Sequence, residues 1–567
     1  MTETTTPIVE KTQTSTAARI GWAVLIAATL YVCYFSHLGA IGFVGPDEPR
    51  YAWIARDMAE SGDWVTPRLY GRPWFEKPPL FYWGAALSFK LFGVSEAAAR
   101  LPSAVSALLA TLALAWLALR LYCAETARWV LLLLPTTVGM IGFSHAAATD
   151  MPFSGMLTIA MVCAAVVLGL TRDENTPILP RTPWLALLLF GFFLGLAALA
   201  KGPAAIILSG GAIFFWALFT KRWRDAFRLV HPVALASFCL TALPWYIACA
   251  RRNPDFFRIF IIEHNFKRFF TPEFQHIQPL WFYVPVILVA LLPWSVALLG
   301  VVSDAVYGLR DRRWTESKSL FLAVWAVFPL MFFSFSRSKL PGYILPTLPP
   351  ITILVAQNLS FGFQRALAIA RWAGLGVAML LMAPAGVLWY FALIRPTREM
   401  LHFDEASLLW VSLCAFAGLI TLILALRDRP AITFFTAVLV LLISLTTLRS
   451  GFIEKNTQGL SVRSSVQAAR NHWPDFDAGK TSSFKLSRGN QYALNFYMRH
   501  EVPTWSQNHR EPGWVFGTKN LWEDSWTEGM DCIFVTNVDT LSQPVVCKDP
   551  DLRNRLASSL PRSGEAQ

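Results

Sequence analysis

The chain has 567 residues, of which 54% are hydrophobic and only 15% are charged. A soluble protein carries about a quarter charged residues and could not cover so much apolar surface, so the composition excludes a soluble globular class. The formal net charge is +12, and the stretch from Ser450 onward holds 13 basic and 13 acidic residues, so the whole excess lies before it. On a membrane protein such an excess favours anionic ligands, with phosphate-bearing lipids first among them.

Hydropathy predicts a polytopic α-helical membrane protein. Residues 1–19 are polar and rich in threonine, which is typical of a disordered tail. The apolar run 20–44 is too long for the core of a signal peptide, so we interpret it as a retained first span. In all, the sequence predicts about thirteen transmembrane helices within 20–449. Their expected extents are 20–44, 101–121, 129–148, 152–170, 184–200, 203–220, 231–250, 281–302, 319–336, 341–357, 371–394, 406–426 and 431–448.

The residues at 450–567 predict a separate, small α/β domain. Their composition is polar, and the segment 461–472 has the pattern of a helix. Cys532–Val538 and Pro544–Cys547 have the pattern of short strands. If this domain faces an oxidising compartment, Cys532 and Cys547 can form a disulfide.

Loop charge predicts the orientation. Basic residues gather at 221–228, 310–318 and 427–429, and the order of the expected spans places these three segments on one side of the membrane. That side is the cytoplasmic side if the N-terminal tail is cytoplasmic. With an odd number of spans, the C-terminal domain then lies outside, in the periplasm of a bacterium. The long segments 45–100 and 251–280 are expected on that same side. We therefore expect a multi-pass protein of the bacterial inner membrane.

Short charged motifs recur at the expected outer ends of the spans. They are DEPRY at 47–51, FEKPPL at 75–80, TDMP at 149–152, AKGP at 200–203, EHNFKRF at 263–269 and SKLPGY at 338–343. Taken singly, each admits a structural role: a carboxylate can stabilise a helix end, Lys201 can snorkel, and Glu76 with Lys77 can form a weak local pair. Ionisable groups at a membrane edge are costly unless paired or functional, so their co-location predicts a site.

This combination of residues fits the transfer of a lipid-linked sugar. Lys and Arg can hold a donor phosphate and stabilise the charge that it gains on leaving. A carboxylate can orient or deprotonate the acceptor and counter positive charge on the sugar. We see no glycine-rich nucleotide loop and no paired-cysteine metal motif, which weighs against an ATP-driven pump.

In this order, the motifs resemble those of the bacterial lipid A 4-amino-4-deoxy-L-arabinose transferases. These enzymes use undecaprenyl-phosphate sugars and belong to the protein-O-mannosyltransferase-like superfamily, with the GT-C fold. The resemblance runs from Asp47 to about Tyr343. It implies thirteen spans, helices after the first span and a periplasmic C-terminal domain. The sequence of that domain and the threonine-rich N-terminal extension offer no match to the family pattern.

The resemblance also implies roles for single residues. Asp47 matches the essential acidic residue and Asp150 a second acidic residue. The residues matched to the donor phosphate are Arg50, Lys77, Lys201, Arg268 and Tyr343, and those matched to the substrate are Tyr51 and Lys339. Glu76 and His264 are similar to residues near a bound divalent metal ion.

The implied reaction moves 4-amino-4-deoxy-L-arabinose, or a related sugar, from undecaprenyl phosphate to a lipid acceptor. In the family's best-known case the acceptor is a lipid A phosphate, a modification linked to polymyxin resistance. We expect no nucleic-acid partner. Other hypotheses are a family member that glycosylates another glycolipid or a protein, a transporter or flippase of the lipid-linked sugar, and a receptor or scaffold. A transporter should show ionisable groups or broken helices near mid-membrane in two related halves, and the sequence shows no such repeat.

Overall fold

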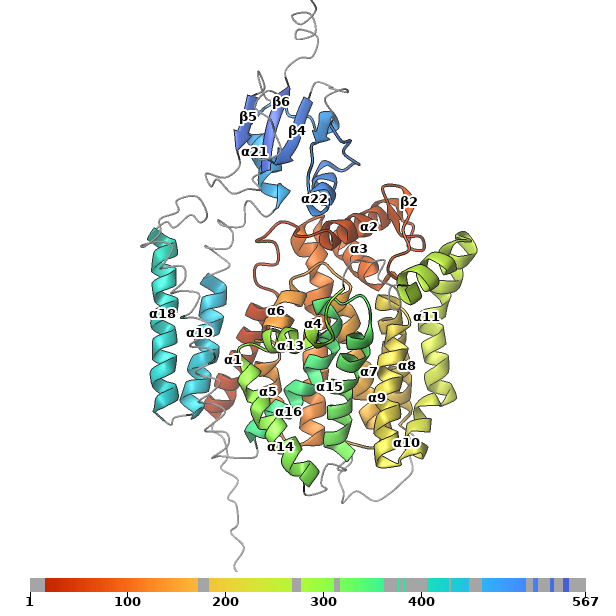
Figure 1. Ribbon diagram of the computed structural model, residues 1–567, viewed down its shortest axis with the longest axis vertical. Helices are drawn as coiled ribbons and strands as arrows, with labels where there is room; N and C mark the ends of the chain where they lie inside the picture. Colours follow the sequence, from red (N-terminus) through yellow and green to blue (C-terminus); the bar gives the residue numbers. More distant parts are fainter. Residues whose placement is uncertain are drawn as a thin grey trace, which may run out of the picture.

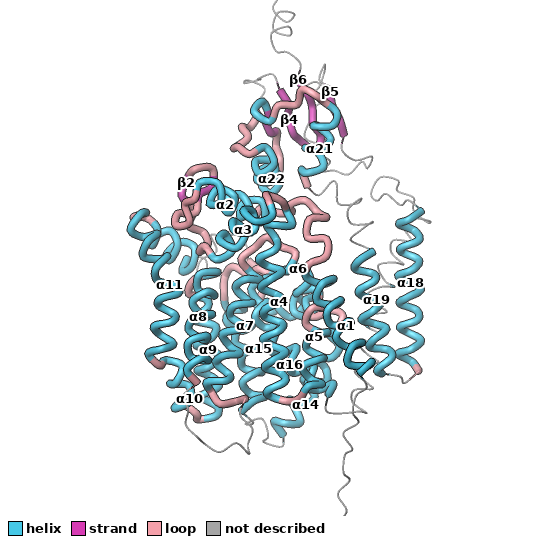
Figure 2. Tube along the Cα trace, turned by 180° about the vertical axis from the view of Figure 1, so that it is seen from behind, coloured by secondary structure: helices cyan, strands magenta, loops and turns pink. Residues whose placement is uncertain are grey.

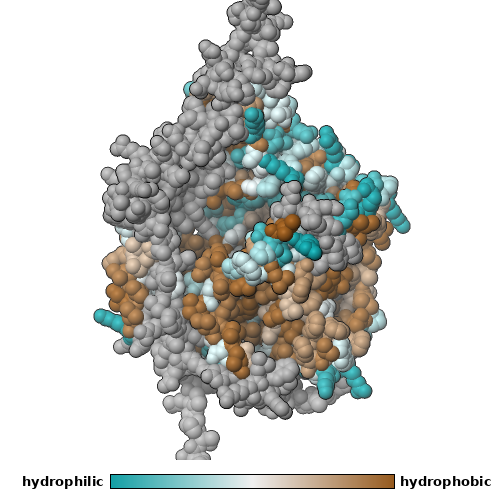
Figure 3. All heavy atoms as spheres, viewed as in Figure 1, coloured by the Kyte–Doolittle hydropathy of each residue, from teal (hydrophilic) through white to brown (hydrophobic). Residues whose placement is uncertain are grey.

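The computed structural model describes residues 16–171, 183–267, 277–310, 317–360, 405–427, 430–447, 461–505, 513–518, 531–534 and 544–549, with single positions at 376 and 382. Long helices run side by side as an upright bundle, and a small sheet stands at one end of it (Figures 1 and 2). Hydrophobic side chains cover the flank of the bundle, and many hydrophilic ones gather toward the end near that sheet (Figure 3). A bilayer would cover such a flank.

The first helix is shorter than the expected span 20–44. Helix α1 (Thr16–Tyr34) ends ten residues earlier, and His37 then turns the chain with a φ of 58°. Two further helices, α2 (Asp47–Ser61) and α3 (Leu80–Phe92), lie across the end of the bundle, joined through the hairpin strands β1 (Arg68–Leu69) and β2 (Arg72–Pro73). Acidic residues in the first turn of α2 stabilise its dipole, and Gly62 ends it with a φ of 74°.

The remaining elements of the bundle follow in chain order. They are α4 (Glu96–Leu121), α5 (Ala124–Leu133), α6 (Val138–Ser144), α7 (Asp150–Val167), α8 (Trp184–Lys201), α9 (Ala204–Thr220), α10 (Trp223–Phe227), η1 (Arg228–Val230), α11 (Pro232–Arg252), η2 (Arg258–Lys267), η3 (Leu280–Phe282), α13 (Tyr283–Ala290), η4 (Trp294–Ala297), α14 (Leu298–Arg310), α15 (Ser317–Phe335), η6 (Pro341–Thr347), α16 (Leu348–Ser360), α18 (Glu405–Leu426) and α19 (Pro430–Thr447). Helix α7 is the most deeply buried and packs between α4 and α8.

Six of the described helices are long and apolar enough to cross a membrane, or up to eight if two bent pairs each form one span. The expected span 129–148 is broken into α5 and α6, which meet at 61°, and the expected span 281–302 is bent by 112° before α14. Pro135 and Pro293 lie at these breaks, where proline cannot donate a helical hydrogen bond. The expected span 371–394 lies almost wholly outside the described residues, so the count of thirteen stays a prediction.

The C-terminal unit contains helices and a sheet, as the sequence indicates. Its elements are α21 (Val462–His472), η9 (Ala478–Lys480), β3 (Thr481–Ser483), α22 (Arg488–Met498), β4 (Gly513–Thr518), β5 (Asp531–Phe534) and β6 (Pro544–Asp549). The strand order is β3-β4-β6-β5, and β5 pairs with β6 in antiparallel fashion. That register sets Cys532 opposite Cys547, and a disulfide joins them. The sequence-based pairing of these two cysteines is thus confirmed.

Candidate active site

The first charged motifs meet in a chain of alternating charges at the start of α2. The Nη2 atom of Arg50 lies 2.5 Å from Asp47 Oδ1 and 3.0 Å from Glu76 Oε2. Glu76 in turn lies 3.5 Å from the Nζ atom of Lys77. Asp47 and Arg50 are close because three residues separate them on one helix. The turn after β2 then carries Glu76 and Lys77 up to the same guanidinium.

Asp47 is more exposed than the other members of this chain of alternating charges. Its side chain is 53% exposed, whereas those of Arg50 and Glu76 are 5% and 10% exposed. The arginine is therefore a buried bridge between one inner and one outer carboxylate. A ligand at the surface can reach Asp47 without any rearrangement of the buried pair.

Aromatic rings surround the guanidinium of Arg50. Its Cζ atom lies 5.2 Å from the ring centre of Tyr51, 5.4 Å from that of Trp74 and 5.8 Å from that of Tyr492. These distances are in the range of cation–π attraction. Burial disfavours the charge of Arg50, but Glu76 and the other neighbouring groups outweigh it, so its pKa is raised above the ordinary value. Arg50 thus keeps its positive charge.

A second buried pair fixes the position of α2. Arg100 donates hydrogen bonds of 2.9 and 2.8 Å to the two carboxylate oxygens of Glu48, and others to backbone carbonyls between residues 38 and 42. Glu48 also accepts hydrogen bonds from the backbone amides of Val44 and Ala147. Ala147 lies three residues before Asp150. The pair therefore ties the helix that carries Asp47 to the loop that leads into α7.

The TDMP, AKGP and SKLPGY motifs meet at the start of α7. Asp150 is the first residue of α7 and Lys201 the last of α8, and because these helices pack in antiparallel fashion the two ends coincide. Lys201 Nζ donates a 2.6 Å hydrogen bond to Asp150 Oδ1 and lies 4.8 Å from the ring centre of Tyr343. Gly342 allows this contact, since a Cβ atom there would lie 2.5 Å from Asp150 Oδ1.

Two other residues that the sequence analysis assigned to substrate binding, Lys339 and Tyr51, are buried. Lys339 is buried, and its ammonium donates to the carbonyls of Gln278 and Ser336. Burial, helped by the nearby charge of Arg337, lowers the pKa of Lys339. Tyr51 is buried beneath Arg50 and packs against Phe81 and Tyr82. In this geometry neither side chain is exposed to a ligand at the surface.

The expected metal ligands do not form a cluster. Within the described ranges, no group of three or more His, Cys, Asp or Glu side chains could hold a metal ion. Glu76 lies between Arg50 and Lys77, and two cations already balance its charge. His264 belongs to η2 (Arg258–Lys267). In this part of the chain, Glu76 and His264 therefore do not fit a divalent metal site. Arg268 lies outside the described residues.

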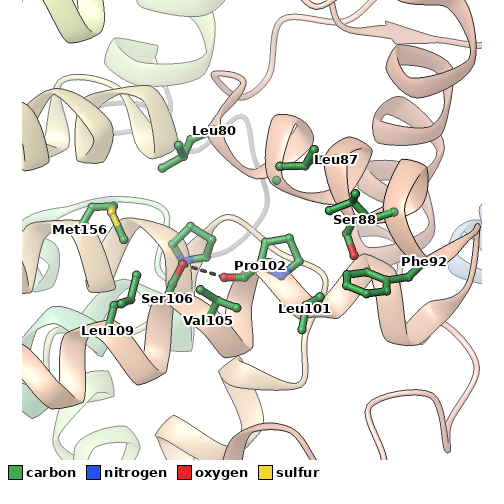
Figure 4. Close-up of a pocket in the computed structure, with 13 residues that line it drawn as sticks. Leu80, Leu87, Ser88, Phe92, Leu101, Pro102, Val105, Ser106, Leu109 and Met156 are labelled. Carbon is green, nitrogen blue, oxygen red and sulfur yellow. Dashed lines mark hydrogen bonds between the residues drawn. The ribbon is translucent and has the colours of Figure 1, made fainter.

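An apolar cavity of about 310 Å³ opens between α3, α4 and α7 (Figure 4). Leu80 lines it from the start of α3, and Pro152 and Met156 line it from α7. Its lining has few polar atoms, and one of them, the hydroxyl of Ser106, donates a hydrogen bond to the carbonyl of Pro102. The cavity therefore suits a hydrocarbon chain.

The chain of alternating charges and the apolar cavity lie close to each other. Leu80 is three residues from Lys77, and Pro152 is two residues from Asp150. Phe75, next to Glu76, packs in one hydrophobic cluster with Leu199, which lies two residues before Lys201. The end of the bundle that carries both charge clusters thus also carries the mouth of an apolar cavity.

Comparison with known proteins identifies the family. A family model described as dolichyl-phosphate-mannose-protein mannosyltransferase matches residues 20–260. A protein of Erwinia tasmaniensis, named undecaprenyl phosphate-alpha-4-amino-4-deoxy-L-arabinose arabinosyl transferase, is 30% identical over 84% of this chain and 90% of its own length. The chain belongs to this arabinosyl transferase family. A Pseudomonas aeruginosa member is 34% identical over 70% of both chains.

Solved structures confirm the GT-C fold of this arabinosyl transferase family member. The crystal structure of ArnT from Cupriavidus metallidurans bound to undecaprenyl phosphate matches with a TM-score of 0.72 and 22% identity, over 93% of this chain and 98% of that one. The apo form of the same protein gives a TM-score of 0.71. The chain is therefore a membrane glycosyltransferase, and the transporter and scaffold hypotheses are set aside.

Sequence reasoning missed the residues that organise the transferase site. Arg100, at the end of the segment 45–100, belongs to none of the six motifs, yet it is buried against Glu48. The position of Glu48 directly beside Asp47 was a usable signal, because two adjacent acids on a helix cannot face the same way. No local signal linked Tyr492 to Arg50, since 442 positions separate them.

Proposed function

We propose that this transferase moves 4-amino-4-deoxy-L-arabinose from undecaprenyl phosphate to a phosphate group of lipid A. The donor class follows that named for the relatives, and undecaprenyl phosphate is the ligand named for the ArnT structure. We further propose that the end carrying α2, α3 and the C-terminal unit faces the periplasm. The basic segment 221–228 then lies in the cytoplasm, in agreement with the positive-inside rule.

One observation carries the proposal: the chain of alternating charges and the apolar cavity meet within the FEKPPL motif. Lys77 belongs to the charged chain, and Leu80, three residues further on at the start of α3, lines the cavity. A polyprenyl phosphate has the matching chemistry, an anionic head joined directly to a branched hydrocarbon chain. Lys77 would bind the phosphate, and the cavity would take up the first part of the chain.

Charge develops at two points in the reaction, on the leaving phosphate and at the anomeric carbon, and both must be stabilised. The bond between the sugar's anomeric carbon and the donor phosphate oxygen breaks, and its electron pair stays on undecaprenyl phosphate. Lys77 and Arg268 would stabilise the charge on that leaving group, with Lys201 nearby in its pair with Asp150. The anomeric carbon, which gains positive charge, bonds to an oxygen of the acceptor, and the carboxylate of Asp47 would face this centre.

Mass spectrometry of lipid A tests the proposed function. We expect lipid A from cells that make the donor lipid and carry the gene to gain the mass of an aminoarabinose residue. Lipid A from the matched deletion strain should lack this species, and the gene on a plasmid should restore it. Identical lipid A in both strains would contradict the lipid A acceptor, and an additional sugar on a different glycolipid would then identify the acceptor instead.

A further inference from the structure

The C-terminal unit rests directly on the active-site helix. One face of α22 carries Gly489, Tyr492 and Phe496, which lie three or four residues apart and therefore share a side of the helix. The ring of Phe496 packs against Phe43 at 4.9 Å, and its carbonyl accepts a 3.2 Å hydrogen bond from Arg56 of α2. Figure 1 shows α22 directly above α2. This face of α22 is thus a docking face for α2.

Close backbone contact fixes the docking next to Asp47. A Cβ atom at Gly489 would lie 2.9 Å from the carbonyl carbon of Gly45, so only glycine allows the two backbones to approach so closely. Gly45 lies two residues before Asp47. The contact therefore constrains the segment from which the exposed carboxylate projects.

Polar contacts anchor the same interface further out. Arg463 donates to the carbonyls of Gly39 and Ala40 at 2.7 and 2.6 Å, and it lies 3.4 Å from Glu96. The hydroxyl of Tyr497 donates a 2.8 Å hydrogen bond to the same Glu96. Because these contacts do not involve Arg50, they hold the unit in place independently of the charged chain.

Tyr492 lies between two arginines. Its ring centre is 5.8 Å from the Cζ atom of Arg50 and 5.5 Å from that of Arg488 on its own helix. Arg488 also donates a 3.3 Å hydrogen bond to its hydroxyl. The ring borders the guanidinium that bridges Asp47 and Glu76.

We infer that the C-terminal unit completes the active site and that Tyr492 is a positioning residue, whose ring holds Arg50 in the orientation that sets the carboxylate of Asp47. This inference rests on the proposed function for its kinetic test. The ring acts through its face, so phenylalanine can replace tyrosine, whereas an aliphatic side chain of similar reach cannot. A substitution of Tyr492 can therefore change the orientation of Arg50 while the C-terminal unit stays docked on α2.

Kinetics of purified variants test the inference. We expect Tyr492→Leu to lower kcat about tenfold with little change in the donor KM, and Tyr492→Phe to recover most of that loss. Arg463→Gln is the matched control: it removes one polar anchor of the interface but leaves the contacts of α22 with α2 and Gly45 in place, so it should lower the melting temperature while kcat changes less than twofold. A Tyr492→Leu protein with wild-type kcat, or a Phe variant as slow as the Leu variant, would overturn the inference.

A double-mutant cycle separates this inference from the proposed function. In an Arg50→Lys background the Tyr492→Leu change should lower the melting temperature less than it does in the wild type, because the planar guanidinium that the ring borders is already gone. This measurement needs no substrate. Fully additive shifts in melting temperature would overturn the positioning role, whereas failure of the wild-type protein to transfer aminoarabinose would count against the proposed function alone.

Discussion

An Arg50→Gln protein is expected to lose at least about hundredfold in sugar transfer and to unfold at a lower temperature. Removing one member of a buried ion pair costs about 3–5 kcal/mol, and we expect the lower end here because Lys77 still neighbours Glu76. The loss of transfer has a second cause, since Asp47 then has no bridge to Glu76 and is free to leave its position. A transfer assay with purified protein, together with a thermal unfolding curve, measures both effects.

The control for Arg50 comes from the same helix. Arg56 is also buried on α2 and pairs with an exposed acid, Glu60, at 2.7 Å. We expect Arg56→Gln to destabilise the protein to a similar extent while most of the transfer activity remains. If both variants lost transfer equally, burial of an arginine on α2 would explain the result, and the special role of Arg50 would be wrong.

An Asp47→Asn protein is expected to unfold at the wild-type temperature and to lose transfer about hundredfold or more. The side chain is half exposed and its pair with Arg50 is therefore worth little for stability. Its charge matters for catalysis, because groups that act on the acceptor or on developing charge contribute about 10²–10⁴-fold. Single-turnover transfer with donor and acceptor supplied measures this effect apart from product release.

Glu60→Gln is the matched control for Asp47. Glu60 is 60% exposed and pairs with a buried arginine on the same helix, so the change removes the same charge at the same depth. Its transfer rate should stay within about twofold of wild type. Wild-type turnover of Asp47→Asn would contradict the role of Asp47, and Asp150 would then become the first candidate for the central carboxylate.

The catalytic role of Asp47 depends on whether the acceptor group is a phosphate or a hydroxyl. A phosphate monoester has a second pKa near 6 and is largely ionised at neutral pH, so it needs no base. A hydroxyl acceptor must lose its proton to a base as it reacts. With a lipid A phosphate as acceptor, Asp47 would act by orienting groups and by countering charge at the anomeric carbon.

The sequence predicted the class of protein and the order of its helices because long apolar blocks leave few alternatives. It also predicted that Asp150 and Lys201 lie on the same side of the membrane, and the structure shows in addition that they pair. Hydropathy could not show that two spans break near Pro135 and Pro293, because the break leaves the apolar composition unchanged. The first span was drawn too long for the same reason.

The inner structure of the site could not be predicted from local sequence. Arg50 and Lys77 both count as cations in a loop, but only the fold shows that Arg50 is buried between two carboxylates. Lys339 has the motif of a substrate ligand, yet its ammonium is occupied by backbone carbonyls. Such differences depend on which partners the fold brings near, and those partners are distant in sequence.

A cryo-electron microscopy structure of this chain with undecaprenyl phosphate bound would show where the donor phosphate lies. We expect the phosphate within hydrogen-bonding distance of Lys77 Nζ and beside Asp47, with the first part of the polyprenyl chain in the cavity lined by Leu80 and Met156. A phosphate bound instead among the basic residues at 221–228, at the opposite end of the bundle, would contradict this expectation.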